Sequence, residues 1–274
     1  MKSVEGEVAE AIEGKVNGMA RKFRSKVFGQ LQQSTINKFA TEDNGAMIAN
    51  LKSKGYEFAD AQIGNFAAVY LTLADRVRRE LVRKYDDKRL EKLAKDKTGK
   101  VNKRNKSEFY RRIANRIGIS REELEATEGL TFQINAYQLE TYQWIRKMRD
   151  ETLQQWTSNT LRLMAEGKSL PEVLSQFDNM VEQRRGHAKM VARTQISTLN
   201  SLVSKTRARN LGIEKAVGGT SGEEGVRPAH EARDGKEFKL ADVSYSSIDG
   251  KTLLPGTDYN CRCDYKMIIP DSDN

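Results

Sequence analysis

Proline is scarce and unevenly distributed in this sequence. All four prolines, Pro171, Pro228, Pro255 and Pro270, lie beyond the first 170 residues. That first part therefore contains no residue that removes a backbone amide donor and breaks a helix. We predict long helices there.

Cysteine is nearly absent, because Cys261 and Cys263 are the only two in the chain. A disulfide between residues this close would close a strained ring, so we expect reduced thiols. The N-terminus is acidic in its first turns and lacks the apolar core of a secretory signal. We therefore expect the protein to be made and released in the cytosol.

Apolar residues make up 38% of the chain, and the mean hydropathy is -0.70. Compact globular domains have roughly 45–50% apolar residues. The longest apolar run, residues 66–71, is far shorter than the roughly 20 residues that span a bilayer. We expect no membrane-spanning helix, and a single compact enzyme core using the whole length is disfavoured.

The spacing of apolar residues predicts helices over most of the first 210 residues. Gly99 and two asparagines interrupt this pattern in segment 97–106, which we interpret as a mobile basic loop. Gly212 is a plausible helix stop. The predicted helices are 4–39, 46–54, 58–95, 108–117, 121–127, 131–166, 169–180 and 182–210.

Glycines and turn pairs cluster after residue 213, around short β-prone pieces at 237–240 and 264–269. The predicted fold is mainly α, with long extended N-terminal helices followed by a small loop-rich α+β unit with short strands. We divide the chain into a basic helical part at 1–150, a second domain at 151–266 and a tail at 267–274.

Positive charge is concentrated in one stretch of the helical part. The chain has 47 Lys or Arg against 38 Asp or Glu, and residues 76–116 alone hold 17 against 6. Such a surplus suits a polyanion such as DNA, although an acidic surface on a portal or scaffolding protein would also satisfy it. The candidate DNA contacts are Arg76, Arg78, Arg79, Arg83, Lys84, Lys97, Lys100, Lys103, Arg104, Lys106, Arg111 and Arg112.

The C-terminal part contains an ordered series of motifs. These are Ala-Arg-Thr-Gln at 192–195, Val-Arg-Pro-Ala-His at 226–230, Asp-Gly at 234–235, Pro-Gly at 255–256 and Asn-Cys-Arg-Cys at 260–263. The series resembles the phage Mu F-like family of minor head, or head morphogenesis, proteins over about residues 151–266. The chain departs from the family in having Gln195 where Glu is usual, and in lacking a Trp before the turn expected at 217–220.

The resemblance implies a non-enzymatic minor capsid protein that takes part in procapsid assembly, packaging or ejection. The implied partners are the portal protein, with scaffolding or major capsid protein as further possibilities. The implied location is the virion or procapsid interior, with few copies per head, after assembly in the host cytoplasm. The motif residues, read as structural, are Arg193, Thr194, Arg227, His230, Asp234, Gly235, Pro255, Gly256, Asn260, Cys261, Arg262 and Cys263.

Two alternatives remain open for the same motif residues. The cationic group with His230 and Asp234 could serve a nuclease or phosphotransferase, but it lacks a second carboxylate and a phosphate-cradling loop. His230, Cys261 and Cys263 could hold zinc, with His187, Asp234 or Asp258 as a fourth ligand only if folding brings one of them near. We favour a structural role without metal.

Overall fold

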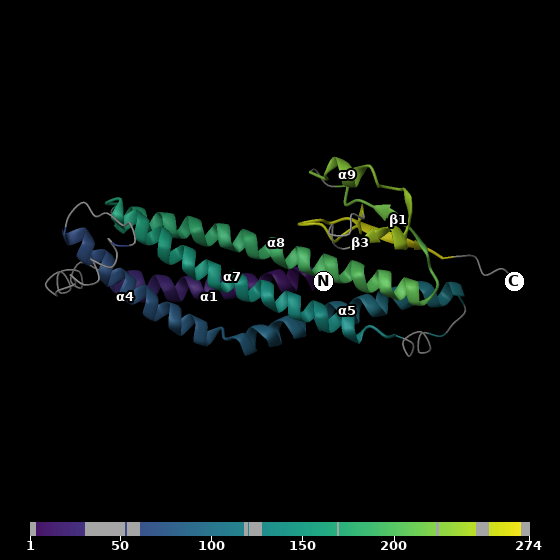
Figure 1. Ribbon diagram of the computed structural model, residues 1–274, viewed down its shortest axis with the longest axis horizontal. Helices are drawn as coiled ribbons and strands as arrows, with labels where there is room; N and C mark the ends of the chain where they lie inside the picture. The colour runs from purple at the N-terminus through teal and green to yellow at the C-terminus, as the bar shows by residue number, and fades with distance from the viewer. Residues whose placement is uncertain are drawn as a thin grey trace. The chain divides into compact units, whose positions relative to one another are not determined.

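The computed structural model describes residues 4–30, 53, 61–117, 120, 128–168, 170–222, 225–244 and 252–269. Long helices dominate, and short strands follow them near the C-terminus, which confirms the predicted fold class (Figure 1). The helices expected at 46–54 and 121–127 lie outside the described residues, apart from Ser53. The long helices are α1 (Val4–Val27), α4 (Ala61–Lys84), α5 (Asp87–Ile117), α7 (Thr131–Ala165) and α8 (Leu170–Asn210).

The chain folds into two compact units, each assembled from separate segments. We call the first the sheet unit, which comprises Met1–Ala9, Glu91–Trp144 and Met190–Asn274. The second, the helical unit, comprises Glu10–Leu90 and Ile145–Lys189. The division at residue 150 stays a prediction.

Aromatic side chains form the core of the helical unit. Helix α1 buries Phe23 on one apolar stripe with Val16 and Met19, as the spacing of an amphipathic helix requires. The Phe23 ring stacks on Phe177 at 5.5 Å between centroids and meets the edge of Trp156 at 5.8 Å. These aromatic pairs join α1 to α7 and α8 within this unit.

The single helix predicted at 58–95 is wrong, because α4 ends at Lys84 and α5 begins at Asp87. The Asp86 carboxylate accepts a hydrogen bond from the backbone amide of Arg89 at 2.9 Å, which is the contact of an N-cap residue. The buried Arg149 guanidinium donates to the Tyr85 carbonyl, which helix α4 leaves without an intrahelical partner. The break is therefore made by a cap and by a distant arginine.

The basic loop predicted at 97–106 is also wrong, because this segment lies inside the continuous helix α5. Val101 and Asn105 are buried, so the segment has an inward face. The Asn105 amide donates to the side chains of Asn200 and Ser204, at 2.6 and 2.7 Å. Tertiary contacts thus outweigh the weak helix propensity of Gly99 and the asparagines.

Helix α8 is one continuous element, although the sequence predicted two helices divided near residue 181. No residue there removes a backbone donor, so nothing interrupts it. Its end is as predicted: Gly212 has a positive φ of 71°. The Ile213 amide bonds to the Ala208 carbonyl and the Gly212 amide to that of Arg209, the pattern of a Schellman motif.

A three-stranded antiparallel sheet in the order β2-β1-β5 follows, made of β1 (Lys215–Gly219), β2 (Glu237–Lys239) and β5 (Asp264–Ile268). Within the sheet unit, Phe109 and Ile113 of α5 pack with Ala216 and Leu240. The turn expected at 217–220 is wrong in part, because residues 217–219 belong to central strand β1. A Cβ on Gly218 would lie 2.6 Å from the Arg233 carbonyl oxygen, so this strand accepts only glycine there.

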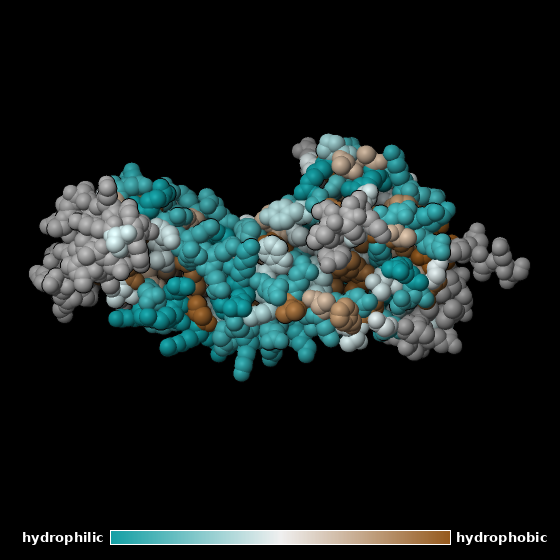
Figure 2. Space-filling model, viewed as in Figure 1, coloured by the Kyte–Doolittle hydropathy of each residue, from teal (hydrophilic) through white to brown (hydrophobic). Residues whose placement is uncertain are grey.

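The remaining short elements are α9 (Pro228–Glu231), β3 (Val243–Ser244) and β4 (Thr252–Leu253), with 3-10 helices at Phe28–Gln30 and Leu240–Asp242. Strands β3 and β4 pair in parallel. Among the described helices, none has a stretch long and apolar enough to cross a bilayer. Hydrophilic side chains dominate the face seen in Figure 2, with small separate apolar areas.

Candidate functional site

Five basic residues of α5 in the sheet unit lie on one side of the helix. Lys97, Lys100, Lys103, Arg104 and Arg111 recur at three-, four- and seven-residue intervals, and the buried Phe109 lies on the opposite side. Lys100, Lys103, Arg104 and Arg111 are exposed, and Lys97 is half-buried. We call these five residues the basic face.

Several cations of the basic stretch already have acidic partners. Lys100 pairs with Glu7, Arg104 with Glu108, and Lys106 with Glu128. Lys103, Arg111 and Arg112 form no ion pair with another described residue. Exposed pairs contribute only about 0–1 kcal/mol each, so the paired cations on the basic face can still turn to a phosphate.

The other predicted DNA contacts lie on α4, in the helical unit. Arg76, Arg78, Arg79, Arg83 and Lys84 are exposed, and Arg79 pairs with Asp75 four residues earlier. The predicted DNA contacts therefore fall into two groups, one on α5 in the sheet unit and one on α4 in the helical unit. Each group belongs to the surface of its own unit.

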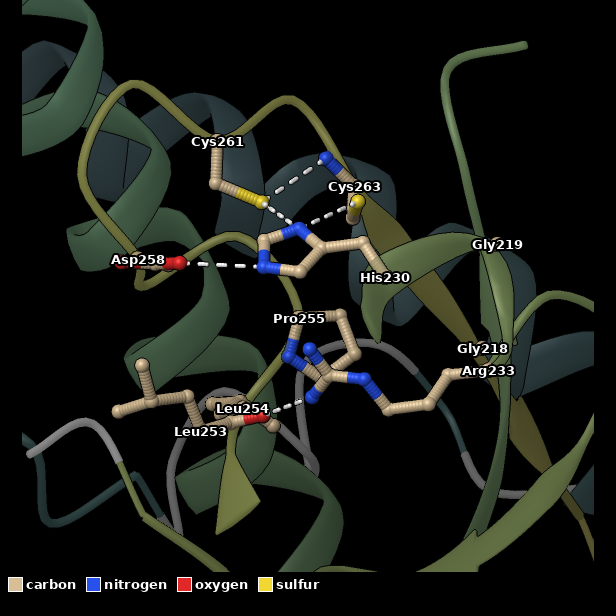
Figure 3. A pocket seen from close by; sticks show the side chains of 10 residues that line it. All are labelled: Gly218, Gly219, His230, Arg233, Leu253, Leu254, Pro255, Asp258, Cys261 and Cys263. Carbon is tan, nitrogen blue, oxygen red and sulfur yellow. Dashed lines mark hydrogen bonds and ion pairs between the residues drawn. The ribbon is translucent and has the colours of Figure 1, made fainter. Parts of the chain in front are cut away.

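Helix α9 places His230 in the interior of the sheet unit. Pro228 stands at the start of the helix, where its missing amide proton costs nothing, and Arg227 before it is extended. The His230 side chain is buried, and its two ring nitrogens have different neighbours (Figure 3).

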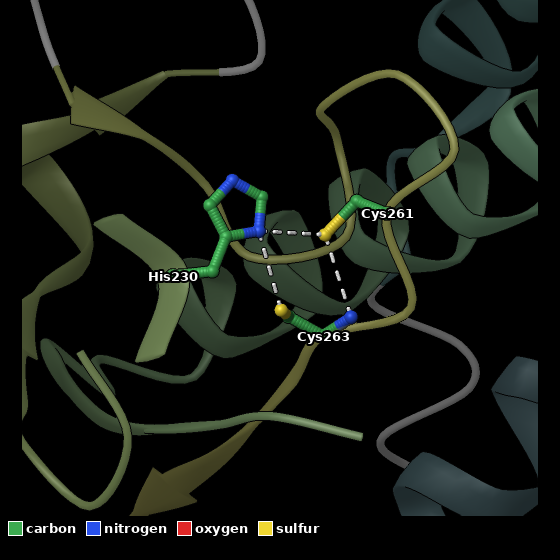
Figure 4. Close-up of side chains that lie close together, drawn as sticks. All are labelled: His230, Cys261 and Cys263. Atoms are coloured by element: carbon green, nitrogen blue, oxygen red, sulfur yellow. Dashed lines mark hydrogen bonds between the residues drawn. The ribbon is translucent and has the colours of Figure 1, made fainter. Parts of the chain in front are cut away.

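The Nδ1 atom of His230 faces both cysteine sulfurs. It lies 3.4 Å from the Sγ of Cys261 and 3.4 Å from the Sγ of Cys263 (Figure 4). The backbone amide of Cys263 also points to the Cys261 sulfur, at 3.4 Å. Burial and the neighbouring Cys261 raise the pKa of the Cys263 thiol to about 12. We call His230, Cys261 and Cys263 the His-Cys cluster.

The Nε2 atom of His230 lies 3.1 Å from a carboxylate oxygen of Asp258. Arg227 donates to that same oxygen at 2.6 Å and to the carbonyl of Tyr259 at 2.7 Å. Asp258 thereby links the helix α9 region to the loop that precedes Cys261. From the sequence, Asp258 was only one of three possible fourth ligands of a zinc ion. The structure places it on the opposite side of the His230 ring from the two sulfurs.

Helix α8 forms hydrogen bonds with the same loop. Arg193 donates to the Asn260 side-chain oxygen at 2.9 Å, and the Thr194 hydroxyl accepts from the Asn260 backbone amide at 2.9 Å. Asn260 has a positive φ of 54°, which Asn tolerates better than most residues. Further along, Ser201 donates to the Pro255 carbonyl at 2.8 Å. Ser201 was missed because a lone serine in a helix carries no sequence signal.

The remaining motif residues hold turns in place. Arg233 donates to the Leu253 carbonyl at 2.7 Å, and the Asp234 carboxylate accepts from the Thr220 amide at 2.8 Å. Gly235 and Gly256 have φ values of 69° and 87°. Arg262 is exposed. Every motif residue that carries a polar side chain, Arg262 included, has an interaction partner.

Gln195, which replaces the usual glutamate of the family motif, is buried. Its side-chain oxygen accepts a hydrogen bond from the Thr141 hydroxyl at 3.2 Å, and its backbone carbonyl accepts from Tyr137 at 3.0 Å. A neutral amide suits this position, because a buried carboxylate would need a cation beside it.

The arrangement of these motifs agrees with a comparison against known families. Residues 154–266 match the family described as Phage Mu protein F like protein. This confirms the resemblance that the motifs predicted. The Phage Mu F-like segment begins within α7, contains all of α8 and the His-Cys cluster, and ends in β5. The family implies phage head morphogenesis, a structural role.

An uncharacterised protein of Haemophilus influenzae is 28% identical over 171 residues, which is 62% of this chain. The aligned region covers 36% of that relative, so the chain spans about a third of its length. No solved structure matches the chain.

Proposed function

We propose that this chain is a minor capsid protein that acts in phage head morphogenesis, without enzymatic activity. In this proposal it joins the procapsid in few copies near the portal, and its basic residues contact packaged DNA. Assembly takes place in the host cytoplasm, and the final location is the interior of the procapsid or virion. The observation that carries the proposal is the Phage Mu F-like match over residues 154–266.

The surroundings of His230 support a structural role over catalysis. A general acid or base needs a ring nitrogen within reach of substrate. Here Nδ1 faces two sulfurs and Nε2 faces Asp258, so neither ring nitrogen is directed to solvent. Arg227 and Arg233 are likewise engaged with protein oxygens. The protein side chains of this cluster are therefore engaged with one another, which disfavours the nuclease or phosphotransferase alternative.

The basic face of α5 supports contact with DNA. Its cations lie along one side of a rigid helix, so they can meet successive phosphates without ordering a loop. Such contacts release counterions and depend on salt, not on sequence. An acidic protein surface on the portal or scaffold is the competing ligand, and the second experiment tests the DNA interpretation.

The first experiment measures the composition of procapsids. Particles assembled with and without portal protein are purified, and this chain is quantified by mass spectrometry against the major capsid protein. We expect a few copies per particle, reduced strongly when portal is absent. Equal incorporation in both would contradict portal association, and absence from all particles would contradict a role in the head.

The second experiment compares two triple variants of equal charge. Replacement of Lys103, Arg104 and Arg111 by Gln removes three cations from the basic face. Replacement of Lys215, Lys236 and Lys239, which are exposed in the sheet region, is the matched control. The first should weaken binding to unrelated DNA duplexes and reduce the salt slope by about 1 per cation. Equal effects of the two variants would show that DNA binding depends only on net charge. That result would contradict a specific role for the basic face.

A further inference from the structure

The His-Cys cluster has the dimensions of a metal site. Zinc bonds thiolate sulfur at about 2.3 Å and imidazole nitrogen at about 2.0–2.1 Å, so a tetrahedral site separates the two ligand atoms by about 3.5 Å. The two N–S distances here are both 3.4 Å. All three ligand atoms lie within 4.8 Å of one another. Two edges of a zinc tetrahedron are thus already formed by the protein.

The second nitrogen of His230 has the partner that metal-binding histidines require. Such histidines donate their other ring N–H to a carboxylate, which orients the ring and makes the ligating nitrogen more basic. Asp258 is a carboxylate 3.1 Å from Nε2, and as an acceptor it favours the tautomer that leaves Nδ1 free to bind. Arg227 holds this carboxylate in turn.

The cysteine backbone contributes as well. The Cys263 amide points to the Cys261 sulfur, and such a donor stabilises a thiolate. Simple hydrogen bonding explains the cluster less well, because one ring nitrogen cannot satisfy two sulfurs that are both weak donors.

The cluster borders a cavity that can admit a fourth ligand. A cavity of about 200 Å³ borders the cluster and is lined by Ser221, Arg227, Asn260 and the three cluster residues, among others. Among the described residues, no fourth His, Cys, Asp or Glu joins the cluster. Asp234 binds the Thr220 amide, so it does not fill the position.

We propose that His230 Nδ1 and the sulfurs of Cys261 and Cys263 bind one zinc ion, with a water from the cavity as the fourth ligand. The two thiols lose their protons to solvent as the ion binds. The zinc ion fastens α9, a helix of four residues, to the loop before β5. Two thiolates and an imidazole select zinc over magnesium or calcium, which prefer oxygen ligands. This proposal is independent of the role in the phage head, and it departs from the structural role without metal that the sequence favoured.

The test begins with metal analysis of the full chain, purified without chelator and with zinc in the growth medium. We expect one zinc per chain in the wild type. Zinc should be lost in Cys261→Ser with Cys263→Ser, and in His230→Gln. The matched control is His187→Gln, which changes the other histidine of the chain and should keep its zinc. Less than about a tenth of an equivalent in the wild type, or equal zinc in the cysteine variant, would overturn the proposal.

A second measurement does not depend on whether the variants fold. Cobalt added to chelator-treated wild-type protein should give thiolate-to-cobalt charge-transfer absorption and the intense visible bands of a tetrahedral site. Zinc should displace it stoichiometrically. Absence of the charge-transfer band would contradict thiolate ligation.

The role of Asp258 is tested by two further variants. Asp258→Asn should weaken zinc affinity about 10–100-fold, the usual effect of removing the partner of a metal-bound histidine. Arg227→Gln removes the Asp258 ion pair but keeps the carboxylate on His230, so it should weaken affinity less. Equal affinities for all three proteins would overturn the positioning role of Asp258.

Discussion

The Nη1 atom of Arg149 lies 2.6 Å from the backbone carbonyl oxygen of Tyr85, in the helical unit. The arginine side chain is 6% exposed and also pairs with Asp87 and Asp150. Its guanidinium therefore donates hydrogen bonds both to the Tyr85 carbonyl after α4 and to the Asp87 carboxylate at the start of α5. A residue more than sixty positions away along the chain thus determines where a helix ends.

Replacement of Arg149 by Met should destabilise the protein by about 2 kcal/mol, because the Tyr85 carbonyl would be left buried without a partner. Asp87 is half exposed, so its loss of a partner adds little. Chemical denaturation measures the change. Arg146→Met is the control, since this exposed residue pairs with the same Asp87 at 3.5 Å. A loss no larger than that of the control would contradict a special role for Arg149.

Two glycines should respond to alanine in opposite directions. A Cβ on Gly256 would clash with the Ser201 hydroxyl oxygen, and the φ of Gly256 is 87°. Gly99 lies in α5 with no neighbouring atom within 4 Å of a Cβ. Gly256→Ala should destabilise by about 2–4 kcal/mol, and Gly99→Ala should stabilise by about 0.5–1 kcal/mol. Thermal and urea unfolding test both, and destabilisation by Gly99→Ala would argue against helix at that position.

Arg207 is the centre of a buried polar network in the sheet unit. Its side chain is 0% exposed, and it contacts Glu128, Asn102 and Asn105. Arg207→Met should cost about 3–5 kcal/mol, because Asn102 and Asn105 would lose their guanidinium partner and Glu128 would keep only the ion pair with Lys106. The double variant with Glu128→Gln should recover part of that loss. A double variant whose losses simply add would show that the two side chains are not coupled.

Glu13 should make stability depend on pH. Burial raises its pKa, but the hydrogen bond and charge of Arg185 and the charge of Lys189 lower it more, so the net direction is down from 4.5. The carboxylate therefore stabilises the fold above about pH 4.5, and this contribution is lost as pH falls through the lowered value. Wild type should exceed Glu13→Gln in stability at pH 7, and the difference should vanish in acid. A constant difference across this range would contradict the ionised pair.

The sequence by itself predicted the features that depend on neighbouring residues. The absence of proline before residue 171 indicated long helices, Gly212 marked a helix end, and the strands at 237–240 and 264–269 were read from short β-prone runs. The ordered motifs were enough to predict the match to the Phage Mu F-like family over residues 154–266. Each signal lies within a few residues, where backbone propensity and turn chemistry act directly.

Tertiary structure decided what long-range contacts control. Asn102 was read as a loop residue, but it packs against Arg207, 105 positions away, and its segment is helical. His230 meets Cys261 and Cys263 across 31 and 33 positions, a convergence that spacing could suggest but not establish. Local propensities amount to less than about 1 kcal/mol per residue, whereas burial of an aromatic ring contributes about 1.5–3 kcal/mol and loss of one partner of a buried ion pair costs about 3–5 kcal/mol. Tertiary contacts of such buried groups therefore outweighed the local secondary-structure propensity of the segment that carries them.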